Sequence, residues 1–417
     1  MSLTSDGVWD VVVVGAGAAG LMAAIRAAEL GRRVLLLEKN RKPGVKILMS
    51  GGTRCNLTHA TDERGVVAAY GPPGRVLHSA LAALGVQDVI DLFEAEGVPV
   101  KVEETGKVFP VSNKALDVLN ALLRRLRRSG ATLALEEPLR DFQVRPPGFA
   151  LTTPHRVVSA SRVILTTGGR SYPGSGTTGD GYVLTARLGH TIVPPRPALV
   201  PITVDAPWVA ELRGVTLPDV GVRVMEGKTI LQAGRGSLLF AHFGLSGPVV
   251  LDLSRVVSGH PAPRLLALEV DLLPGWKEAD LDEHLRVETA AAGKKQLAAV
   301  LAVHLPRRLC DALLPQAGLS VDRRAAALSR PDRARLVDCL KRLRLPTTGT
   351  LGFGKAEVTA GGVALAEVDS RTMQSKIVPG LYIAGELLDL DGPIGGYNFQ
   401  AAWSTGWLAG TAADDGL

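Results

Sequence analysis

The chain has 417 residues, of which 46% are hydrophobic, 21% are charged and only 4% are aromatic. This composition is typical of a globular protein with more than one core, and it excludes a disordered or collagen-like chain. The three cysteines lie far apart without a CxxC pair, which excludes a local dithiol centre and favours a reducing compartment. No His, Cys or carboxylate cluster has metal-ligand spacing, so no metal site is predicted.

The N-terminal region carries the strongest local pattern. An apolar run at 11–14 leads into the glycine pattern of residues 15–20 (GAGAAG), a stretch of helical composition follows, and a second apolar run ends near Leu37. This order predicts the βαβ opening of a doubly wound fold. In such a turn Gly15 permits the sharp bend, Gly17 lets a pyrophosphate approach the backbone, and the third glycine allows close packing. With Glu38 placed to bind ribose hydroxyls, the segment predicts an adenine-dinucleotide site.

The same segment is apolar enough to resemble a signal sequence, but glycines interrupt it and no basic residues precede it. No run of about 18 uninterrupted apolar residues occurs elsewhere. The sequence therefore predicts a cytoplasmic protein that does not associate with membranes.

Three further segments favour FAD over NAD. Residues 46–56 (KILMSGGTRCN) combine cations, small residues and polar donors, which suits a backbone that follows a phosphate and a flavin edge. Residues 165–169 (LTTGG) end a strand with glycines, like the crossover turn of large flavoproteins. Residues 174–179 repeat the GxGxxG spacing, but a proline rather than a strand precedes them, so they are predicted to be a loop that leads into a helix at Asp180.

The C-terminal region supplies the third segment. Residues 381–386 (LYIAGE) end a strand with a glycine and an acid, which resembles the flavoprotein segment whose carboxylate binds the ribitol chain. Residues 395–402 (GGYNFQAA) open a helix whose N-terminus can point at the flavin pyrimidine oxygen, where negative charge gathers on reduction. NAD enzymes need no such return of the chain.

The predicted cofactor-binding residues therefore come from both ends of the chain. They are Gly15, Gly17, Ala18, Ala19, Gly20, Glu38, Lys39, Lys46, Ser50, Gly51, Gly52, Arg54, Cys55, Asn56, Thr167, Gly168, Gly385, Glu386, Gly395, Gly396, Tyr397, Asn398 and Gln400.

Proline and glycine breaks divide the chain at 194–197, at 274–275 and at Pro346. Between the first two breaks short β-type runs alternate with glycines, and between the last two the pattern is helical. The sequence thus predicts an α/β protein with an FAD-binding domain at 1–197 and 347–417, a β-barrel-like insert at 198–274 and a helical insert at 275–346.

Several stretches, taken together, resemble the BaiN/RdsA family of FAD-dependent oxidoreductases, also described as YhiN-like flavoproteins. They are 46–58, 167–181, 242–253 (HFGLSGPVVLDL), 357–362 (EVTAGG) and 380–402. The resemblance spans nearly the whole chain in the expected order. It implies a Rossmann-type FAD-binding domain built from both chain ends, with a β-barrel-like and a small helical domain inserted, which agrees with the breaks.

Individual residues carry over to the family's motifs. The N-terminal glycines and Glu38 match its adenosine-diphosphate site, residues 46 and 54–56 match its SGGxRCN loop, and Gly385, Glu386, Gly396 and Asn398 match its C-terminal flavin site. Thr53 stands where that loop more usually has glycine, and this departure adds a side chain close to the expected cofactor.

Three residues are candidates for catalysis. Cys55 could donate a proton to the substrate or pack beside the cofactor. His242 could act as an acid near neutral pH or be a structural histidine. Tyr397 could line the flavin face or serve only in packing. Lys46 and Arg54 are expected to bind phosphate or to hold the loop.

FAD chemistry favours a reductase that takes hydride from transiently bound NADH or NADPH and passes it to an electron-poor double bond, such as that of a small-molecule enone or an rRNA uridine. The resemblance implies reductases that act on diverse substrates, including steroid-like intermediates and a uridine of ribosomal RNA. The segment 294–344 has 12 Lys and Arg against 4 Asp and Glu, which suits an RNA contact or a solvated helical face. Phosphate contacts would come from Arg307, Arg308, Arg323, Arg324, Lys341, Arg342 and Arg344.

Other functions remain open from the sequence: an FAD oxidase that uses oxygen, a non-catalytic FAD-binding redox sensor or scaffold, and a flavin-free NAD-dependent dehydrogenase. The physiological substrate, the preferred nicotinamide and the oligomeric state are not specified by any pattern in the sequence.

Overall fold

The computed structural model describes residues 7–413, which fall into two compact units. The first unit is built from both ends of the chain, up to Arg196 and again from Glu357, and the second unit is Pro197–Ala356. The predicted fold class, an α/β Rossmann-type domain formed by both chain ends with inserted β-barrel and helical parts, is confirmed.

The core of the first unit is a seven-stranded sheet in the order β6-β2-β1-β9-β8-β7, with β18 also pairing β9. Strands β6, β2, β1, β9 and β18 are parallel, and β8 and β7 form an antiparallel edge. The valine run of β1 is buried on both faces, which is typical of a central parallel strand. The strands are β1 (Val8–Val14), β2 (Val34–Leu37), β6 (Thr132–Ala134), β7 (Asp141–Arg145), β8 (Gly148–Thr152), β9 (Val157–Leu165) and β18 (Leu381–Ile383).

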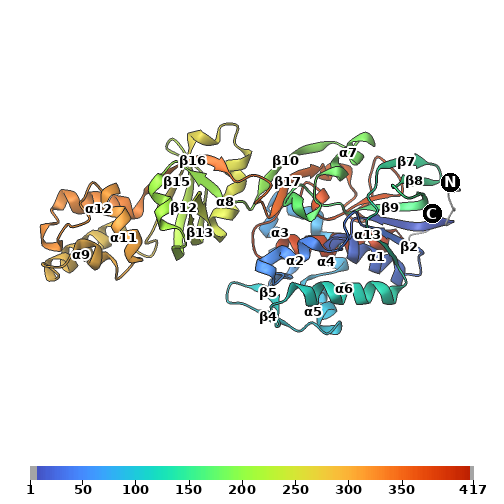
Figure 1. Cartoon of the computed structure of the whole chain (residues 1–417), viewed down its shortest axis with the longest axis horizontal. Coiled ribbons are helices and arrows are strands. Elements are labelled where there is room, and N and C mark those ends of the chain that lie inside the picture. Colours follow the sequence, from blue (N-terminus) through green and yellow to red (C-terminus); the bar gives the residue numbers. More distant parts are fainter. Residues whose placement is uncertain (1–6, 414–417) are drawn as a thin grey trace. The chain divides into compact units, whose positions relative to one another are not determined.

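Two helices from opposite ends of the chain, α1 (Ala18–Glu29) and α13 (Tyr397–Ala412), lie side by side in this unit (Figure 1). Their close approach depends on glycines of α13. A Cβ at Gly406 would lie 2.2 Å from the carbonyl oxygen of Ala19, and one at Gly410 would lie 2.5 Å from that of Ala23. The start of α1 therefore lies beside the middle of α13, and the backbone N–H of Gly385, just after β18, donates to Thr405 of the same helix at 3.1 Å. The two chain ends pack against each other there.

Smaller elements surround this sheet. A three-stranded sheet and a two-stranded pair accompany the helices. The remaining elements of the unit are α2 (Val45–Met49), β3 (Thr58–His59), α3 (Glu63–Tyr70), α4 (His78–Ala83), α5 (Val86–Ala95), β4 (Val100–Val102), β5 (Lys107–Pro110), α6 (Ala115–Ser129), α7 (Asp180–Arg187), β10 (Ile192–Ala198) and β17 (Val358–Val363).

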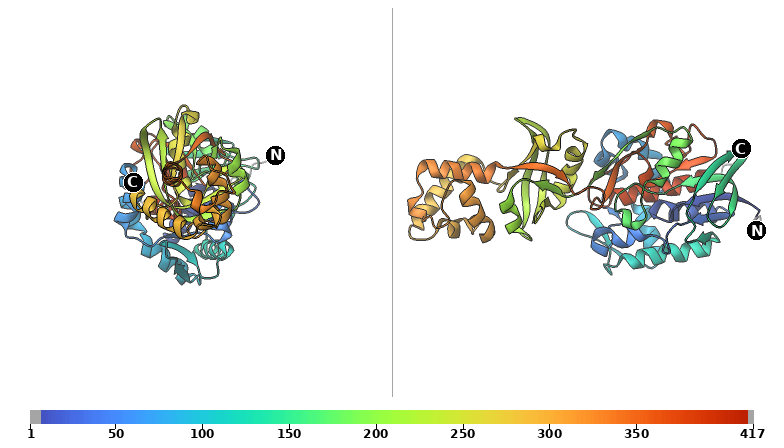
Figure 2. Two further views of the ribbon diagram at one scale, coloured as in Figure 1. Left: turned by 90° about the vertical axis from the view of Figure 1, so that its left-hand side faces the viewer. Right: turned by 45° about the horizontal axis from the view of Figure 1, so that its top comes forward.

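The second unit contains a closed barrel in the order β11-β14-β13-β12-β15-β16, together with helices that share one hydrophobic core with it (Figure 2). The last barrel strand, β16, pairs with both β11 and β15. The domain boundary expected between residues 346 and 347 therefore falls inside this strand. The elements are β11 (Ile202–Val204), β12 (Thr216–Glu226), β13 (Thr229–Ala241), β14 (Gly244–Ser246), α8 (Pro248–Gly259), β15 (Leu266–Asp271), α9 (Glu278–Ala291), α10 (Leu297–Leu301), α11 (Arg307–Gln316), α12 (Arg330–Lys341) and β16 (Leu343–Thr350).

Among residues 7–413, no single helix is long and apolar enough to cross a membrane. One bent helix pair, Pro72–Ala83 with Val86–Ala95, passes the same test of length and composition. Within the same range no three His, Cys, Asp or Glu side chains are grouped so that they could hold a metal ion.

Candidate functional site

The glycine turn between β1 and α1 has two kinds of glycine. Gly15 has a φ of 100° and a Cβ there would lie 2.6 Å from the carbonyl oxygen of Thr166, while a Cβ at Gly20 would lie 1.8 Å from that of Gly15. These two glycines are required by the protein's own packing. Gly17 is different, because a Cβ there would meet nothing within 4 Å. The backbone at Gly17 therefore borders open space at the N-terminus of α1, which no side chain caps.

The buried carboxylate of Glu38 lies beside this turn, at the end of β2. It accepts hydrogen bonds from the backbone N–H groups of Ala16 and Asn40, both at 2.8 Å. A carboxylate has about four acceptor positions, so each oxygen keeps one for a ribose hydroxyl. Ala18 and Ala19 form the first turn of α1, where their small side chains leave the helix N-terminus accessible.

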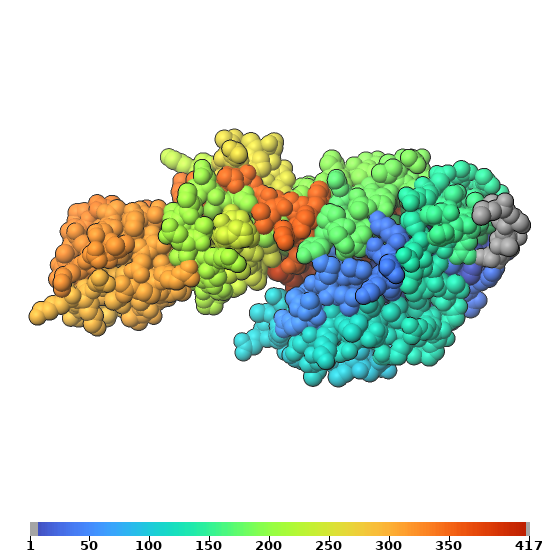
Figure 3. Space-filling model, viewed as in Figure 1, coloured from blue at the N-terminus to red at the C-terminus, as the bar shows by residue number. Residues whose placement is uncertain are grey.

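Lys39 and Asn40 connect this end of β2 to the segment that follows β9. The Lys39 ammonium group donates to Thr178 at 2.9 Å and to Asp180 at 2.6 Å, and the Asn40 amide donates to the carbonyl oxygen of Ser175 at 3.0 Å. On the face shown in Figure 3, blue atoms of the N-terminal segment lie against green atoms of this loop. Lys39 therefore acts within the protein as a link between two segments.

The loop after α2 has an unusual backbone. Gly51, Gly52, Thr53 and Cys55 all have φ between 53° and 71°. A non-glycine residue in this region carries a strain of about 1 kcal/mol or more. Glycine is more usual at position 53 and adopts the left-handed conformation freely. Thr53 has the same left-handed conformation, so the departure from the family motif leaves the backbone turn in place. Ser50 begins the turn and donates to the carbonyl oxygen of Ile47.

Cys55 is fully buried in this loop. Burial raises the pKa of its thiol to about 12, against a smaller lowering effect of a hydrogen bond with Ser50. The thiol therefore stays protonated at neutral pH. A group with so high a pKa is a poor proton donor near neutrality, and the geometry favours a packing role for Cys55.

Arg54 and Asn56 lie on either side of Cys55, and their side chains differ in whether their polar groups have partners within the protein. The Arg54 guanidinium donates to Glu103 at 2.7 Å and lies 3.9 Å from the centre of the Phe109 ring, so it holds the loop instead of offering its charge to a phosphate. The Asn56 side-chain oxygen is buried without a hydrogen-bond partner. A Cβ at Gly396 would lie 2.9 Å from that oxygen, which places it at the start of α13.

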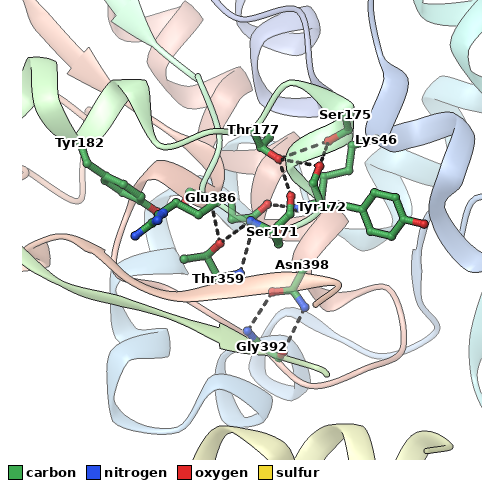
Figure 4. A network of polar contacts seen from close by, with 11 residues as sticks. Lys46, Ser171, Tyr172, Ser175, Thr177, Tyr182, Thr359, Glu386, Gly392 and Asn398 are labelled. Carbon is green, nitrogen blue, oxygen red and sulfur yellow. Dashed lines mark hydrogen bonds and ion pairs between the residues drawn. The ribbon is translucent and has the colours of Figure 1, made fainter. Parts of the chain in front are cut away.

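A polar network joins four segments of the chain at Glu386 (Figure 4). One carboxylate oxygen accepts from the Ser171 hydroxyl at 2.6 Å and from the backbone N–H of Thr359 at 2.8 Å. The other oxygen pairs with the Lys46 ammonium group, which also donates to Ser171 at 2.6 Å. Lys46 and Glu386, both predicted to bind the cofactor, thus bind each other. We call this cluster of Lys46, Ser171, Thr359 and Glu386 the Glu386 network.

The turn before α13 brings together residues that the sequence did not single out. Gly395 and Gly396 have φ values of 130° and 99°, and no side chain caps the helix. Tyr397 stacks on His59 with 4.6 Å between ring centres, and the His59 Nδ1 atom lies 3.1 Å from the carbonyl oxygen of Gly395. The hydroxyl of buried Tyr70 donates to the carbonyl oxygen of Tyr397 at 2.9 Å. His59 and Tyr70 therefore fix the position of this helix start.

Two predicted residues of α13 direct their side chains into the protein. Asn398 exchanges hydrogen bonds with the backbone of Gly392 at 2.9 and 3.0 Å (Figure 4). Gln400 is buried and is bonded to Thr58, Ser404 and the carbonyl oxygen of Leu84. Both stabilise the packing around the helix start, and Gln400 has no polar atom left to offer a cofactor.

The remaining predicted residues fall in three places. Gly168 has a φ of 75° and packs close to Thr177, and Thr167 has a buried hydroxyl without a hydrogen-bond partner. Gly385 has a φ of 71°, and a Cβ there would lie 2.8 Å from that of Ala19, so it meets the start of α1. His242 lies in the second unit, exposed in the turn between β13 and β14 with its ring against Phe243.

These residues fit a bound dinucleotide such as FAD. Open space at Gly17 borders an uncapped helix N-terminus, which suits a pyrophosphate. A second uncapped helix start lies at Gly396, beside the unpartnered side-chain oxygen of Asn56. The backbone N–H groups of this helix start offer donors to a flavin edge, and the Asn56 oxygen offers an acceptor. Buried polar atoms without partners are rare in folded proteins and call for a ligand or an ordered water.

Comparisons with known proteins identify the family of the chain. The chain matches the HI0933-like protein Rossmann domain over residues 9–412. It is 37% identical over 402 residues to the ribosomal RNA dihydrouridine synthase of Escherichia coli K12, with 96% of each chain covered. It is 34% identical to the enzyme of the same name from Haemophilus influenzae, covering 95% of this chain and 96% of that one.

A third relative is the 3-dehydro-bile acid delta(4,6)-reductase of Clostridium scindens, at 31% identity with 96% of this chain and 98% of the relative covered. Among solved structures, 3-ketosteroid-delta4-(5alpha)-dehydrogenase from Rhodococcus jostii matches with a TM-score of 0.50 and 17% identity, over 100% of this chain and 99% of the other. That likeness shows the fold. The chain therefore belongs to the HI0933-like family, a family of oxidoreductases with a Rossmann-type FAD-binding fold.

Proposed function

We propose that this chain is an FAD-dependent reductase that uses NADH or NADPH to reduce an electron-poor carbon–carbon double bond, and that its substrate is a uridine in ribosomal RNA. The observation that carries the proposal is full-length similarity, at 37% and 34% identity, to two enzymes named ribosomal RNA dihydrouridine synthase. Similarity over the whole length covers the second unit as well as the cofactor site.

The first unit supplies the groups that would hold FAD. The N-terminus of α1 and the open backbone at Gly17 would receive the pyrophosphate, and Glu38 would accept from the ribose hydroxyls. The N-terminus of α13 and the Asn56 oxygen would face the flavin. Bound FAD would supply hydride transfer between a nicotinamide and a conjugated double bond.

The overall reaction balances as uridine, NAD(P)H and one proton giving dihydrouridine and NAD(P)⁺. The pyrimidine double bond gains a hydride at one carbon and a proton at the other. Tyr397 is the candidate for the proton among the residues of the first unit, because its ring lies at the helix start whereas the Cys55 thiol is buried with a raised pKa. His59 stacks on that ring and would orient it.

Ion pairing divides the basic residues that were predicted to contact RNA into two groups. Among the seven predicted, five form ion pairs with carboxylates of the protein: Arg307, Arg323, Lys341, Arg342 and Arg344. Arg308 and Arg324 are exposed and donate only to backbone carbonyls, so their charges are not neutralised. We propose that these two residues, with exposed Lys294 and Lys295, supply the phosphate contacts.

Reduction of a small-molecule enone is the second candidate. The 31% identity to the bile acid delta(4,6)-reductase over nearly the whole chain supports it specifically. Both candidate substrates present a double bond that is conjugated to a carbonyl group, so the same site chemistry serves both.

Complementation tests the proposal and separates these candidates. The chain would be expressed in Escherichia coli that lacks its own ribosomal RNA dihydrouridine synthase, and dihydrouridine in the ribosomal RNA would be measured by nucleoside mass spectrometry. The proposal expects the modification to return with the wild-type chain. The purified protein should also be reduced by NADH or NADPH without oxygen and reoxidised by the unmodified RNA.

Other outcomes identify the rivals. Reoxidation by steroid enones but not by RNA would favour the small-molecule reductase. Rapid turnover with oxygen alone would indicate an oxidase, and a yellow protein that no nicotinamide reduces would indicate a redox sensor or scaffold. A protein that binds no flavin would contradict the proposal altogether.

A further inference from the structure

The loop that connects β9 to α7 has one buried end and one exposed end. At the start, the backbone N–H groups of Arg170 and Ser171 donate to the Thr359 hydroxyl at 2.8 and 3.0 Å. The Ser171 side chain is fully buried within the Glu386 network. At the other end Asp180 begins α7, and its side chain is 45% exposed. We call residues 171–180 the strap.

The exposed end of the strap is attached to the residues that follow β2. Lys39 donates to Thr178 and to Asp180, at 2.9 and 2.6 Å. Asn40 donates to the carbonyl oxygen of Ser175 at 3.0 Å, and a Cβ at Gly176 would lie only 2.5 Å from the Asn40 amide nitrogen. Although burial opposes the effect, hydrogen bonds from Lys39 and Thr178 lower the pKa of Asp180, so its carboxylate is charged at neutral pH.

The sheet order shows what the strap spans. Strands β2 and β9 flank β1 on its two sides, and the glycine turn with Gly17 lies at the carboxyl end of β1. The strap runs from the carboxyl end of β9 to the residue pair directly after Glu38, so it passes the carboxyl end of β1, where the pyrophosphate and ribose would lie. Lys39 adjoins the ribose-binding position itself.

The backbone of the strap suits a segment that moves. Tyr172 has a φ of 56°, a conformation that costs a non-glycine residue about 1 kcal/mol or more. Its ring points away from the polar network (Figure 4). Gly176 and Gly179 have φ values of 98° and 87°, and glycines of this kind absorb the changes in backbone angle that a hinge requires.

We propose that the strap closes over the adenosine half of the cofactor and that the ion pair of Lys39 with Asp180 is its latch, which sets the rate at which FAD leaves. The inference rests on the proposed FAD-dependent function. The buried end at Ser171 stays fixed, and the solvent-exposed ion pair, with side chains 29% and 45% exposed, opens and closes.

The test is the rate of FAD release from the holoprotein, followed by the rise in fluorescence of free flavin after dilution into an excess of an FAD-binding trap protein. Lys39→Met is expected to release FAD about fivefold faster, because the loss of a partly exposed, hydrogen-bonded ion pair changes the free energy by an amount that corresponds to about this factor in the rate. The matched control is Lys42→Met, which removes the charge of a residue exposed three positions along the chain and is expected to leave the rate unchanged.

A double-mutant cycle separates a latch from direct contact between Lys39 and the cofactor. The latch predicts that Asp180→Asn speeds release as Lys39→Met does and that the two changes together add little more. It also predicts that salt speeds release from the wild type but not from Lys39→Met, because salt screens exposed ion pairs.

Equal release rates in the wild type, Lys39→Met and Asp180→Asn would overturn the latch while leaving the FAD-dependent function intact. Additive effects of the two substitutions would also overturn it, because they would show that Lys39 acts on FAD directly. Wild-type protein that takes up no FAD would overturn the proposed function and the strap together.

Discussion

At the scale of single residues, the Glu386 network decides how the cofactor site is held. Glu386 accepts from Lys46, Ser171 and Thr359, which come from three segments far apart in the sequence. The Lys46 and Glu386 side chains are 28% and 19% exposed, so water compensates little for a lost partner. The network therefore joins residues from both ends of the chain in one polar cluster.

Replacing Glu386 by Gln removes the charge that Lys46 faces and is expected to lower the free energy of unfolding by about 2 kcal/mol. Urea unfolding of the cofactor-free protein measures the change. Glu278→Gln is the matched control, because its ion pair with Arg342 is exposed on both sides, and its effect should be much smaller. A loss no larger than that of the control would show that the network does not contribute to stability.

The thiols give a second prediction at this scale. Burial raises the pKa of Cys55 and Cys310 to about 12 and that of Cys339 to about 11. At pH 8 a disulfide reagent such as dithionitrobenzoate should therefore react with none of the three thiols in the native protein and with all three after denaturation. Rapid native labelling of Cys55 would restore it as a candidate for chemistry.

At the scale of elements, the helix pair α1 and α13 depends on glycines. An alanine in an exposed helix is normally more stable than a glycine, but a Cβ at Gly406 would lie 2.2 Å from the carbonyl oxygen of Ala19. Gly406→Ala is therefore expected to cost about 2 kcal/mol. The control is Gly275→Ala, where a Cβ would meet nothing within 4 Å. Calorimetric unfolding of both variants checks this, and equal stabilities would contradict the close packing.

The helices of the second unit contain a histidine pair that makes stability depend on pH. The Nε2 atoms of His284 and His304 lie 3.0 Å apart beside Trp276. Burial and the neighbouring His284 lower the pKa of His304 below the ordinary value near 6.5. The folded state thus favours neutral His304, so its contribution to stability is complete above about pH 6.5 and is lost as the pH falls through the folded-state pKa.

The midpoint temperature of thermal unfolding is therefore expected to fall as the pH is lowered from 7.5 to 5.5. In His304→Gln the midpoint should depend less on pH. His242→Gln serves as the control, because His242 is exposed and lies outside the pair. An unchanged pH dependence in His304→Gln would show that other groups control the acid sensitivity.

Several elements could be predicted from the sequence because their signals are local. The glycine turn after β1, the strand that precedes Gly385 and the helix that starts after Gly396 each carry adjacent residues with a specific backbone requirement. The contacts of Tyr70 with Tyr397 and of Ser171 with Glu386 join residues 327 and 215 positions apart. Such pairings have no spacing that a single sequence reveals, although Ser171 lies in a stretch that the family resemblance includes.

At the scale of the whole molecule, the family resemblance gave the fold class, and the structure confirmed a domain built from both chain ends. The net charge of the segment 294–344 was less informative about which residues could contact RNA. The excess of Lys and Arg at 294–344 suggested an RNA contact or a solvated helical face. In the structure, five of the seven residues proposed to contact phosphate pair with carboxylates, and several of these partners lie outside that segment, as Glu278 and Glu269 do. Net charge counted along the sequence cannot show such pairing.

The RNA contact is tested at this scale. Replacing both Arg308 and Arg324 by Ala is expected to weaken binding to ribosomal RNA fragments and to reduce its salt dependence, because unneutralised charges release counterions on binding. Arg342→Ala, which removes a charge already paired with Glu278 and Asp338, is the control and should have little effect. Filter binding at several salt concentrations measures the affinity for RNA and its salt dependence. Equal losses of affinity in the double variant and in Arg342→Ala would contradict the assignment of Arg308 and Arg324 as phosphate contacts.

The central claim is that turns from both chain ends hold one FAD, and the FAD content of the wild type and of Gly17→Ala tests it most directly. A Cβ at Gly17 meets nothing of the protein within 4 Å, so the variant should fold and unfold like the cofactor-free wild type. We expect about one FAD per wild-type chain and affinity roughly tenfold or more weaker in Gly17→Ala, because the methyl group would occupy the pyrophosphate position. A wild-type chain without FAD, or a variant that binds it equally well, would contradict the account.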